Sequence, residues 1–485
     1  MTHDKAKSDR GKQVAPATPM YTLNDVLEGT RGRLDEATGA LAMTGLGFNS
    51  VAIDSRAALS GALFVALMGE RVDGHEFVLD AAGHGARGAL VREDWTAPAT
   101  LPPGMALIRV PDPLAALQSF AAWWRARFDV QVVGVTGSVG KTSTKEVIAG
   151  VLSTRYNTLK SEGNLNNEIG CPLTVLRLGT EHRKAVLEMG AGYRLGELTL
   201  LCEIARPEIA VVTVVGPVHL ERMGTIENIA LNKSELVRAL PRTGTAVLNG
   251  DDLLVRRMRE VASARVLLYG LDPEWDIYAS DIEGQGLQGV HFTLHVKATG
   301  ERWRIRLPLL GRHSVHTALA AAGAGMAAGM DWDSIIMALQ RLDAQVRLLV
   351  VPGYNGSTLI DDSYNASPDS TMAALNLLED MPGQRVAVLG DMLELGSYER
   401  EGHLKVARRA AGVAHRLVVV GSLGRLIGEE ALRSGMPQDR VFFAADNEQV
   451  AVYLKRVLKA GDYVLVKGSR GLKMEQIVDA LKVDV

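Results

Sequence analysis

Short apolar runs, separated by glycine, proline and polar clusters, mark the first quarter of the chain. Runs of this kind, bounded by turn residues, are typical of buried strands, and they lie at 62–67, 88–92 and 106–110. A helical spacing follows over 114–128, and we expect its Trp123 and Trp124 to be packing residues. The pattern predicts a small α/β domain over residues 20–129.

From residue 130 onward, apolar runs alternate with helical patterns. The β-branched run 130–136 opens this region, and further strands are predicted at 185–188, 209–215, 245–248 and 266–269. Such alternation predicts a parallel sheet covered by helices. Consecutive strands within 275–308, including 290–296 and 303–307, predict an added antiparallel patch. With the helical residues 313–330, the pattern gives a central domain over 130–345.

The last part of the chain repeats the alternation. Strands are predicted at 358–361, 386–389, 417–420 and 463–466, and helices at 370–378, 399–411 and 447–458. This indicates a Rossmann-like C-terminal domain over 346–485. The first nineteen residues are polar and carry mixed charge, so we expect a disordered tail over 1–19. The predicted fold class is therefore α/β, with three domains.

Composition and charge narrow the function classes. The chain has 485 residues, of which 47% are hydrophobic and 22% charged, so disorder of the whole chain is excluded. Its formal net charge of −3 supplies no basic field for nucleic acid. The two cysteines, Cys171 and Cys202, form no CxxC pair, which excludes a zinc ribbon and suits a reducing compartment. Without a secretory signal or a membrane-spanning run, we expect a cytoplasmic protein that does not insert into membranes.

The strongest chemical signal is a glycine-rich turn between a predicted strand and a predicted helix. Its residues are Thr136, Gly137, Ser138, Val139, Gly140, Lys141 and Thr142. Backbone N–H groups in such a turn can wrap a phosphate, and the following helix N-terminus adds partial positive charge. Lys141 would reach the β- and γ-phosphates, and the Thr142 hydroxyl would bind Mg²⁺. Val135 stands where the strict P-loop pattern requires glycine, so the loop matches only the shorter pattern T-G-S-x-G-K-T.

Two further side chains follow neighbouring strands. Glu188 ends the run 185–188, and His219 follows the run 209–215. Ligands bind outside the carboxyl ends of parallel strands, so both should face the edge that carries the phosphate loop. A carboxylate there can hold Mg²⁺ and an imidazole can complete its shell, although either residue taken alone is more often structural. Lys233, in a helical stretch over 226–240, is by itself read as a surface group.

These motifs, in this order, resemble the Mur ligases of peptidoglycan synthesis, from Tyr21 to the C-terminus. The resemblance rests on Asp54-Ser55-Arg56 with Asp73-Gly74-His75 in the first domain and on the phosphate loop with Glu162 to Gly170 in the second. In the third domain it rests on Ile360 to Pro368, Val388 to Gly396 and Val466 to Gly471. The motifs Ile360 to Pro368 and Val388 to Gly396 match the last ligase of the pathway.

The resemblance implies roles for individual residues. A UDP-linked substrate would contact Ser55, Arg56, Asn164, Asn166 and Asn167. ATP would be contacted, beyond the phosphate loop, by His313, Arg347, Asp362, Tyr364 and Asn365. The catalytic residues would be Lys141, Lys233 and His219, and the metal ligands Thr142, Glu188, His219 and a carbamylated Lys233. Lys467 and Arg470 would hold the incoming dipeptide, although a solvated loop pair remains the alternative for them.

The sequence departs from the family pattern on the adenine side. The usual G-x-H-N-x-x-N motif reads here as Gly311-Arg312-His313-Ser314-Val315-His316-Thr317, so both amides are replaced. The usual Thr-Asn pair before the His219 loop is Thr213-Val214. Neither change touches the phosphate loop, Glu188, His219 or Lys233, so we expect the chemistry to be retained.

The resemblance implies a reaction. ATP would phosphorylate the carboxylate of a UDP-N-acetylmuramoyl-tripeptide, and D-alanyl-D-alanine would attack the acyl phosphate, with Mg²⁺ as cofactor and a monomeric enzyme. One alternative is the preceding amino-acid-adding ligase, but the D-N-P-R tetrapeptide of its diaminopimelate type is absent from the sequence. A folylpolyglutamate synthetase would lack the uridine-type first domain. The remaining alternative is a P-loop switch that hydrolyses ATP slowly without an amine acceptor.

Overall fold

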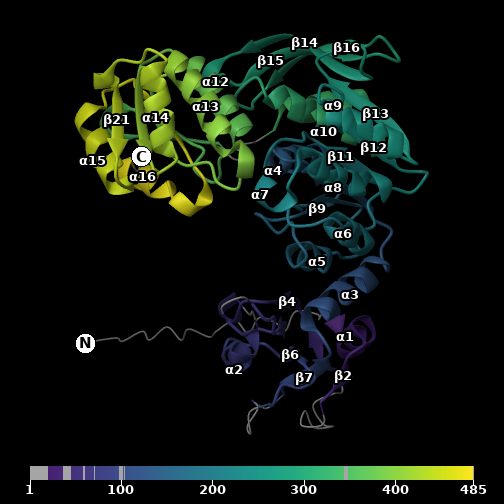
Figure 1. Ribbon diagram of the computed structural model, residues 1–485. Helices are drawn as coiled ribbons and strands as arrows, with labels where there is room; N and C mark the ends of the chain where they lie inside the picture. The colour runs from purple at the N-terminus through teal and green to yellow at the C-terminus, as the bar shows by residue number, and fades with distance from the viewer. Residues whose placement is uncertain are drawn as a thin grey trace, which may run out of the picture. The chain divides into compact units, whose positions relative to one another are not determined.

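A computed structural model describes residues 20–35, 45–57, 60–69, 72–97, 102, 104–342 and 348–483 (Figure 1). The chain forms two compact units. The first comprises the residues up to Arg127 together with Val175–Arg177, and the second comprises Phe128–Thr174 and Leu178–Val485. The predicted disordered tail 1–19 and the predicted ATP contact Arg347 lie outside the described residues. The elements described below confirm the α/β fold class.

The first unit contains a five-stranded sheet in the order β2-β7-β6-β5-β4. Strands β4 to β7 run parallel and β2 is antiparallel to β7. The bounds are β2 Arg33–Leu34, β4 Ser50–Ala52, β5 Ala62–Val65, β6 Gly88–Arg92 and β7 Ala106–Val110, and a small antiparallel pair joins β1 Tyr21–Thr22 to β3 Gly47–Phe48.

Local sequence explains the helices of this unit, which are α1 Leu23–Thr30, α2 Val78–Gly83 and α3 Pro113–Arg125. Thr22 and Asp25 form a capping box at the start of α1, and Asp112 caps α3, where Pro113 occupies the first turn. The ring of Trp124 is buried 4.7 Å from that of Tyr21, which confirms its predicted packing role. Trp123 is half-buried and stacks on Trp124.

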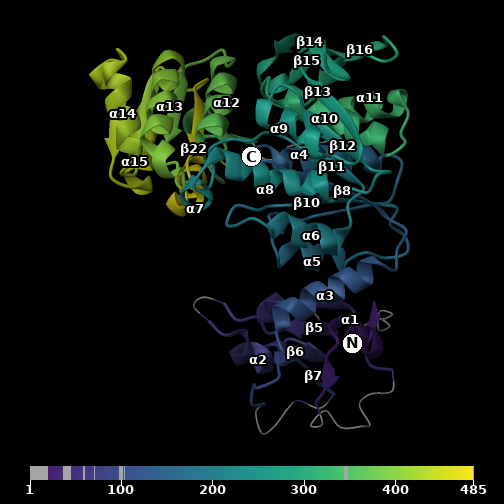
Figure 2. The same ribbon diagram turned by 45° about the vertical axis from the view of Figure 1, so that its right-hand side comes forward.

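The second unit contains a nine-stranded sheet in the order β16-β15-β14-β13-β12-β11-β8-β10-β9. All neighbours from β9 to β14 run parallel, whereas β14, β15 and β16 pair antiparallel at one end (Figure 2). This confirms the predicted antiparallel patch. The bounds are β8 Gln131–Thr136, β9 Thr158–Lys160, β10 Lys184–Glu188, β11 Ile209–Val212, β12 Thr245–Asn249, β13 Arg265–Gly270, β14 Ile277–Gly284, β15 Val290–Val296 and β16 Arg302–Leu307.

Helices cover both faces of this sheet. Apolar residues of α4 Lys141–Ser153, α10 Ser314–Ala327 and α11 Trp332–Gln340 form one core with the strands. On the other face, α8 Ile226–Arg238 contacts β8 and β11 and packs against α6 Glu197–Ala205. Shorter helices are α5 Gly170–Val175, α7 Leu220–Met223 and α9 Leu253–Arg257.

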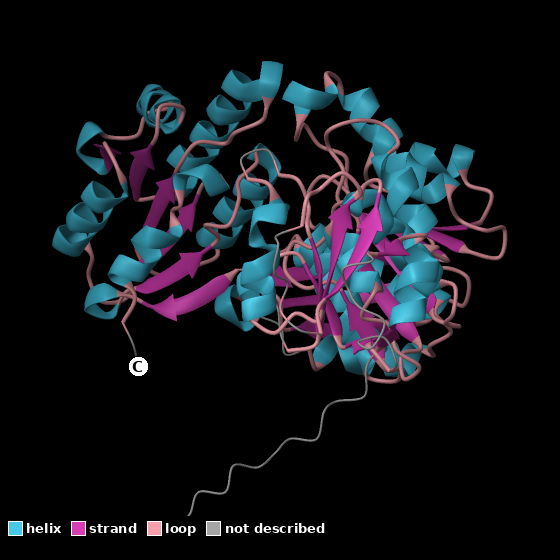
Figure 3. Cartoon of the chain, turned by 90° about the horizontal axis from the view of Figure 1, so that it is seen from below, coloured by secondary structure: helices cyan, strands magenta, loops and turns pink. Residues whose placement is uncertain are grey.

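A six-stranded sheet follows, in the order β17-β18-β22-β19-β20-β21. Only β17 is antiparallel, to its neighbour β18. Two apolar cores line its faces, one with α12, α13 and α14 and the other with α15 and α16. Figure 3 shows helices on both sides of the strands in the C-terminal part of the chain. The bounds are β17 Leu349–Pro352, β18 Thr358–Asp361, β19 Arg385–Leu389, β20 Arg416–Val420, β21 Val441–Ala444, β22 Tyr463–Lys467, α12 Pro368–Glu379, α13 Glu399–Val413, α14 Gly424–Arg433, α15 Asn447–Val457 and α16 Glu475–Leu481.

The structure corrects one predicted strand and adds elements. The strand predicted over 209–215 ends at Val212, because Val214 and Val215 leave the ladder and bond to a loop serine and to Asp252 instead. Strands β9, β17 and β21 and helices α11 and α14 carried too weak a pattern to be predicted. In the described ranges, no helix combines the length and the apolar character needed to cross a bilayer.

Replacement of Leu319 tests whether α10 anchors the core of the nine-stranded sheet. Leu319 is fully buried there, so Leu319→Ala should lower the free energy of unfolding by about 2–5 kcal/mol through reduced burial and a cavity. Urea unfolding followed by circular dichroism measures this. Met337→Ala, at a side chain that is 47% exposed on α11, should change it by no more than about 0.5 kcal/mol. Equal effects of the two substitutions would refute the assignment.

Candidate active site

The phosphate loop connects β8 to α4, as predicted from the sequence. Gly137 has φ of +143° and Gly140 has φ of +85°, conformations that L-residues with side chains rarely adopt. Gly140 precedes Lys141, the first residue of α4, and Thr142 is the second. The loop therefore presents its backbone and a helix N-terminus at the carboxyl end of β8.

The segment after β11 holds the loop in shape. The Thr213 hydroxyl donates to the carbonyl oxygen of Val139 at 2.6 Å, and the Ser138 amide donates to Val214 at 2.7 Å. The Ser138 hydroxyl also donates to the Gly216 carbonyl at 3.0 Å. A Cβ at Gly137 would lie 2.0 Å from Thr213 Oγ1, so only glycine fits there. From the sequence, the segment was noted only because Val214 replaces the usual Asn after Thr213, and this bracing role was missed.

Lys141 lies over the loop that it follows. Its ammonium donates to the carbonyl oxygens of Gly137 at 2.7 Å and Ser138 at 3.3 Å. The charge is thereby kept within the turn where phosphate oxygens would bind. The Thr136 hydroxyl is buried and bonds to no described residue.

Glu188 is a buried carboxylate beside the loop. It is 2% exposed at the end of β10, where it pairs in register with Val135 of β8. Asn166 donates to Glu188 Oε1 at 2.7 Å, whereas Oε2 is buried and has no hydrogen-bond partner among the described residues. A buried oxygen without a donor is costly unless a cation or another donor meets it. The prediction that Glu188 faces the loop edge is confirmed.

Lys233 is also buried, at 2% exposed, on α8. Its ammonium bonds to the Ala191 carbonyl, just past β10, and donates to Asn232 Oδ1 at 3.2 Å. Burial, helped by the charge of Lys141, lowers the pKa of Lys233 to about 7, against the pull of Glu197 and Glu235. Burial thus favours the neutral amine of Lys233. The default interpretation of Lys233 as a surface group is wrong.

Two acidic residues fix the loop that receives Lys233. Glu197 Oε2 accepts from the amides of Gly192 at 2.9 Å and Tyr193 at 3.0 Å. Glu235 accepts from the Gly196 amide at 2.7 Å and the Thr199 amide at 2.9 Å, at the start of α6. Neither glutamate was singled out from the sequence. Glu235 stands two residues after Lys233, and this short spacing is the sequence signal from which its role could have been predicted.

His219 occupies a constrained position in the same unit. Its φ of +57° is left-handed, and its Nδ1 lies 2.5 Å from Glu394 Oε2. Burial lowers the pKa of His219 and Glu394 raises it, while Lys141 and Lys233 lower it further. The three predicted catalytic residues are therefore close enough to influence one another's charge.

Residues predicted to contact ATP or the dipeptide meet around Lys467. The Lys467 ammonium is buried and donates to Asp362 Oδ2 at 2.5 Å and to the Asn365 carbonyl at 2.9 Å. Desolvation by the surrounding protein is the main cause that lowers the pKa of His313. The charge of Asp362 raises this pKa, and the charge of Lys467 lowers it further. Lys467 thus organises the 362–365 loop.

Tyr364 and Arg470 form an exposed pair beside that loop. The guanidinium carbon of Arg470 lies 5.3 Å from the ring centre of Tyr364. Its Nη1 lies 3.5 Å from Glu475 Oε1, and the side chain is largely exposed. Arg470 therefore presents a positive charge to solvent, as a residue that binds a carboxylate would.

The predicted uridine motif of the first unit is partly structural. Arg56 is exposed and makes a two-point ion pair with Asp54, at 2.9 and 2.7 Å, whereas Ser55 is buried. His75 is buried between the Asp73 carboxylate, 2.6 Å from Nδ1, and the Arg92 amide, which donates to Nε2 at 2.9 Å. With both ring nitrogens bonded, His75 stabilises the fold of the motif.

The three asparagines predicted to contact the UDP-linked substrate lie in the second unit. Asn166 donates to Glu188 as described. Asn167 Oδ1 accepts from the Gly170 amide at 2.9 Å and so caps α5, and the Asn164 carbonyl accepts from the Asn166 amide. The side chain of Asn166 thereby orients the candidate metal ligand.

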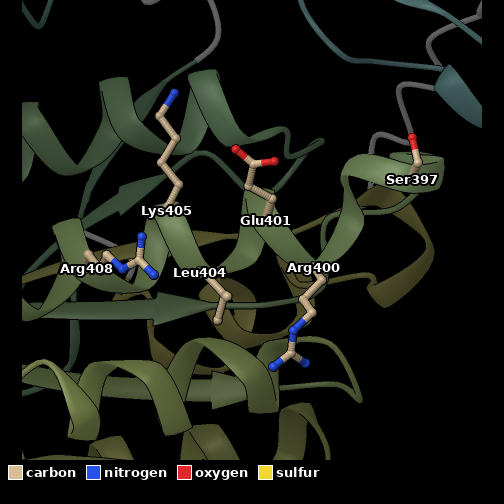
Figure 4. A pocket seen from close by; sticks show the side chains of 6 residues that line it. All are labelled: Ser397, Arg400, Glu401, Leu404, Lys405 and Arg408. Atoms are coloured by element: carbon tan, nitrogen blue, oxygen red, sulfur yellow. The ribbon is translucent and has the colours of Figure 1, made fainter.

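A shallow groove of about 360 Å³ runs along α13. Figure 4 shows that Lys405 and Glu401 point to one side of the helix, and Arg400 and Leu404 to the other. Lys405 lies 3.6 Å from Asp369, and Arg408 pairs with Glu430 at 2.9 Å. Because its side chains diverge and are partly ion-paired, the groove is no competing active site.

The donor set fits Mg²⁺. In the parts of the chain that the structure describes, no group of three histidines, cysteines or acidic residues forms a metal cage. Mg²⁺ instead favours one or two carboxylates completed by substrate phosphates and water. Glu188, with its unpartnered Oε2, and the Thr142 hydroxyl at the start of α4 match that preference.

A parallel sheet that carries a phosphate-binding loop, a buried carboxylate and a buried lysine at one edge defines a nucleotide-binding α/β enzyme. Family models match this chain over most of its length: "Mur ligase family, catalytic domain" at 48–125, "Mur ligase middle domain" at 135–325 and "Mur ligase, glutamate ligase domain" at 346–470. The chain belongs to the Mur ligase family.

Individual relatives cover nearly the whole chain. The UDP-N-acetylmuramoyl-tripeptide–D-alanyl-D-alanine ligase of Bacillus subtilis is 37% identical and covers 89% of this chain and 93% of its own. Among solved structures, MurF from Acinetobacter baumannii has a TM-score of 0.83 at 30% identity and covers 95% of this chain and 98% of its own. MurF from Thermotoga maritima, solved with ADP, has a TM-score of 0.76 at 28% identity, with 89% and 96% covered.

Gly137→Ala tests the bracing of the phosphate loop. The added Cβ would meet Thr213, and φ of +143° strains any L-residue. We expect nucleotide affinity, measured by isothermal titration calorimetry, to fall at least tenfold while the circular dichroism spectrum is retained. Gly412→Ala, at a helical position with open space around it, should leave affinity unchanged. Wild-type affinity of Gly137→Ala would show that the loop does not need this geometry.

Proposed function

We propose that this chain uses ATP to join D-alanyl-D-alanine to UDP-N-acetylmuramoyl-tripeptide. The observation that carries the proposal is the meeting of three features at the carboxyl edge of one sheet: the phosphate loop, Glu188 with its unpartnered oxygen, and the buried Lys233. Relatives that match nearly the whole chain are named as this ligase. The preceding ligase of the pathway is an outcome of the test below.

In the first step, a carboxylate oxygen of the tripeptide terminus attacks the γ-phosphorus of ATP. An O–P bond forms, the bond from the γ-phosphorus to the β-phosphate oxygen breaks, and ADP leaves with that electron pair. Lys141 and the amides of the phosphate loop stabilise the negative charge on the transferred group. Their fixed orientation, held by Thr213, makes this stabilisation available without rearrangement of the loop.

In the second step, the free amine of D-alanyl-D-alanine attacks the acyl carbonyl carbon. A C–N bond forms, the C–O bond to phosphate breaks, and the amine proton is released to solvent. Arg470, exposed beside Tyr364, would bind the dipeptide carboxylate, and Lys467 would hold the loop that carries Asp362, Tyr364 and Asn365 against the nucleotide. His313 would contact the nucleotide from the start of α10.

Mg²⁺ would be held by Thr142, Glu188, His219 and a carbamylated Lys233. When bound, it would neutralise phosphate charge and orient the phosphoryl group. Asn166 keeps Glu188 Oε1 bonded, which leaves Oε2 as the oxygen that would bind the cation. Glu394 holds His219 Nδ1 and so leaves Nε2 as its ligating atom.

The buried amine of Lys233 supports the proposed carbamylation. A neutral amine attacks CO2 to form a C–N bond and releases one proton, which leaves an anionic carbamate. The lowered pKa of about 7 supplies the neutral amine near physiological pH. The product replaces a cation by an anion beside Lys141, which removes a repulsion between two ammonium groups.

The remaining substrate contacts involve the first unit. Ser55 and Arg56 would contact the UDP-linked substrate, and we propose the same role for Asn164, Asn166 and Asn167. We propose three domains with the limits 20–129, 130–345 and 346–485. Each domain would bind mainly one class of substrate. We place the enzyme in the cytoplasm, since its substrates are ATP and a nucleotide-linked precursor, and we propose that it acts as a monomer.

A coupled assay tests the function. Purified protein is incubated with ATP, Mg²⁺, D-alanyl-D-alanine and UDP-N-acetylmuramoyl-tripeptide carrying lysine or diaminopimelate, and product mass and phosphate release are followed. We expect the pentapeptide product and phosphate release that needs both acceptor substrates. Lys141→Ala should abolish both and remain folded. Phosphate release without any amine acceptor would favour a P-loop switch, and addition of a single amino acid would favour the preceding ligase.

Lys233→Ala tests the carbamate. We expect activity to fall at least a hundredfold and short carboxylates such as formate to restore part of it. In wild-type protein equilibrated with ¹³C-bicarbonate, a carbamate NMR signal should grow from pH 6 to pH 8, because only the neutral amine reacts and its fraction rises above a pKa of about 7. The signal should be missing in Lys233→Ala. A fully active Lys233→Ala enzyme would end the carbamate proposal.

A further inference from the structure

One residue interrupts the burial of α10. Between Ser314 and Gly325 every residue of this helix is buried except His316, whose side chain is 31% exposed. The Ser314 hydroxyl donates to the Leu310 carbonyl at 2.6 Å, and Thr317 is buried. Among the first residues of α10, His316 therefore offers the polar side chain that can meet a ligand.

His316 lies at the edge of the sheet that carries the phosphate loop. Helices α4 and α10 pack along each other, and Arg155 and Asp331, just beyond their C-terminal ends, are 3.1 Å apart. The two helices run in the same direction, so their N-terminal ends lie at the same edge. Asp251, which bonds His316, comes two residues after the end of β12 and is therefore at that edge as well.

Asp251 fixes the orientation of the ring. Its carboxylate accepts from the Trp275 indole at 2.8 Å, the Leu271 amide at 2.9 Å and His316 Nε2 at 2.7 Å. Although burial opposes it, these bonds lower the pKa of Asp251 and keep it ionised. An ionised carboxylate only accepts, so Nε2 carries a proton, and in the neutral form of the ring the lone pair is on Nδ1.

The lone pair at Nδ1 is available. No residue in the described ranges forms a hydrogen bond with His316 Nδ1. In the sheet, β11 separates β8 from β12, so the phosphate loop and Asp251 stand about 10 Å apart at roughly 4.8 Å per strand. That separation suits the span from the phosphates to the base of a nucleotide.

We propose that His316 Nδ1 accepts a hydrogen bond from the exocyclic amino group of the adenine of ATP, with Asp251 as the positioning residue. This rests on the proposed function only in taking ATP as the nucleotide. The acceptor meets the C6 amino group of ATP, whereas inosine triphosphate (ITP) presents a carbonyl oxygen at C6 that would face a lone pair. His316 would therefore discriminate between bases without contacting the reacting atoms.

His316→Phe tests the contact, since phenylalanine keeps the ring shape and removes both nitrogens. KM is measured for ATP and ITP in the coupled assay, with Kd for both nucleotides from calorimetry. We expect KM and Kd for ATP to rise about tenfold, because the substitution removes one hydrogen bond to the base. Values for ITP should change less than twofold, and kcat with ATP should stay within twofold. The matched control is His295→Phe, at a histidine on β15 whose ring bonds to the Ser280 hydroxyl. This substitution should leave KM and Kd unchanged for both nucleotides.

Other outcomes overturn the assignment. Equal losses for ATP and ITP would make His316 a structural residue, and no loss for either would remove it from the site. A loss with ATP that disappears with 2′-deoxy-ATP instead of ITP would assign the contact to the ribose. If the wild type binds ATP but makes no product, the proposed function fails while the Kd comparison still decides the role of His316.

Discussion

The packing of Gly137 against Thr213 is the constraint on which the candidate site depends. A phosphate loop can stabilise charge only if its amides already point inward, and a free loop of seven residues would sample many conformations. Here the segment that leaves β11 bonds the loop at Val139, Ser138 and Thr136, and a side chain at position 137 would collide with it. The same segment continues into His219, so one piece of chain both shapes the loop and delivers a candidate metal ligand.

Burial gives the remaining charged groups their chemistry. Lys233 would be an ordinary cation in water, but without solvent and beside Lys141 its charged form is disfavoured. Glu188, also buried, retains one oxygen without a donor. A buried lysine, a half-buried lysine and a buried carboxylate with one unbonded oxygen lie at one edge of the sheet. Polyphosphate with a divalent cation has the charges that complement them.

The sequence predicted those parts of the fold that repeat regularly. The strands β8, β10, β12 and β15, the antiparallel patch and the loop between β8 and α4 are all visible as patterns, and Glu188 follows from the rule for strand ends. The departure of Thr213–Val215 from the predicted strand could not be foreseen, because those residues are β-branched and only their bonds to the phosphate loop and to Asp252 remove them from the ladder. The burial of Lys233 depends on contacts 42 residues apart in the chain, which no local pattern contains.

Departures from a family motif also have a physical interpretation once partners are known. Ser314 replaces an amide that could reach outward, and its hydroxyl turns back to the Leu310 carbonyl, one turn earlier. A short hydroxyl on a helix finds that carbonyl first, so it cannot replace the reach of an amide. His316 can, because its ring extends beyond the helix and Asp251 fixes which nitrogen carries the proton. Positions 314 and 317 therefore offer no outward amide, while His316 between them supplies a polar atom that a carboxylate from the neighbouring strand holds in place.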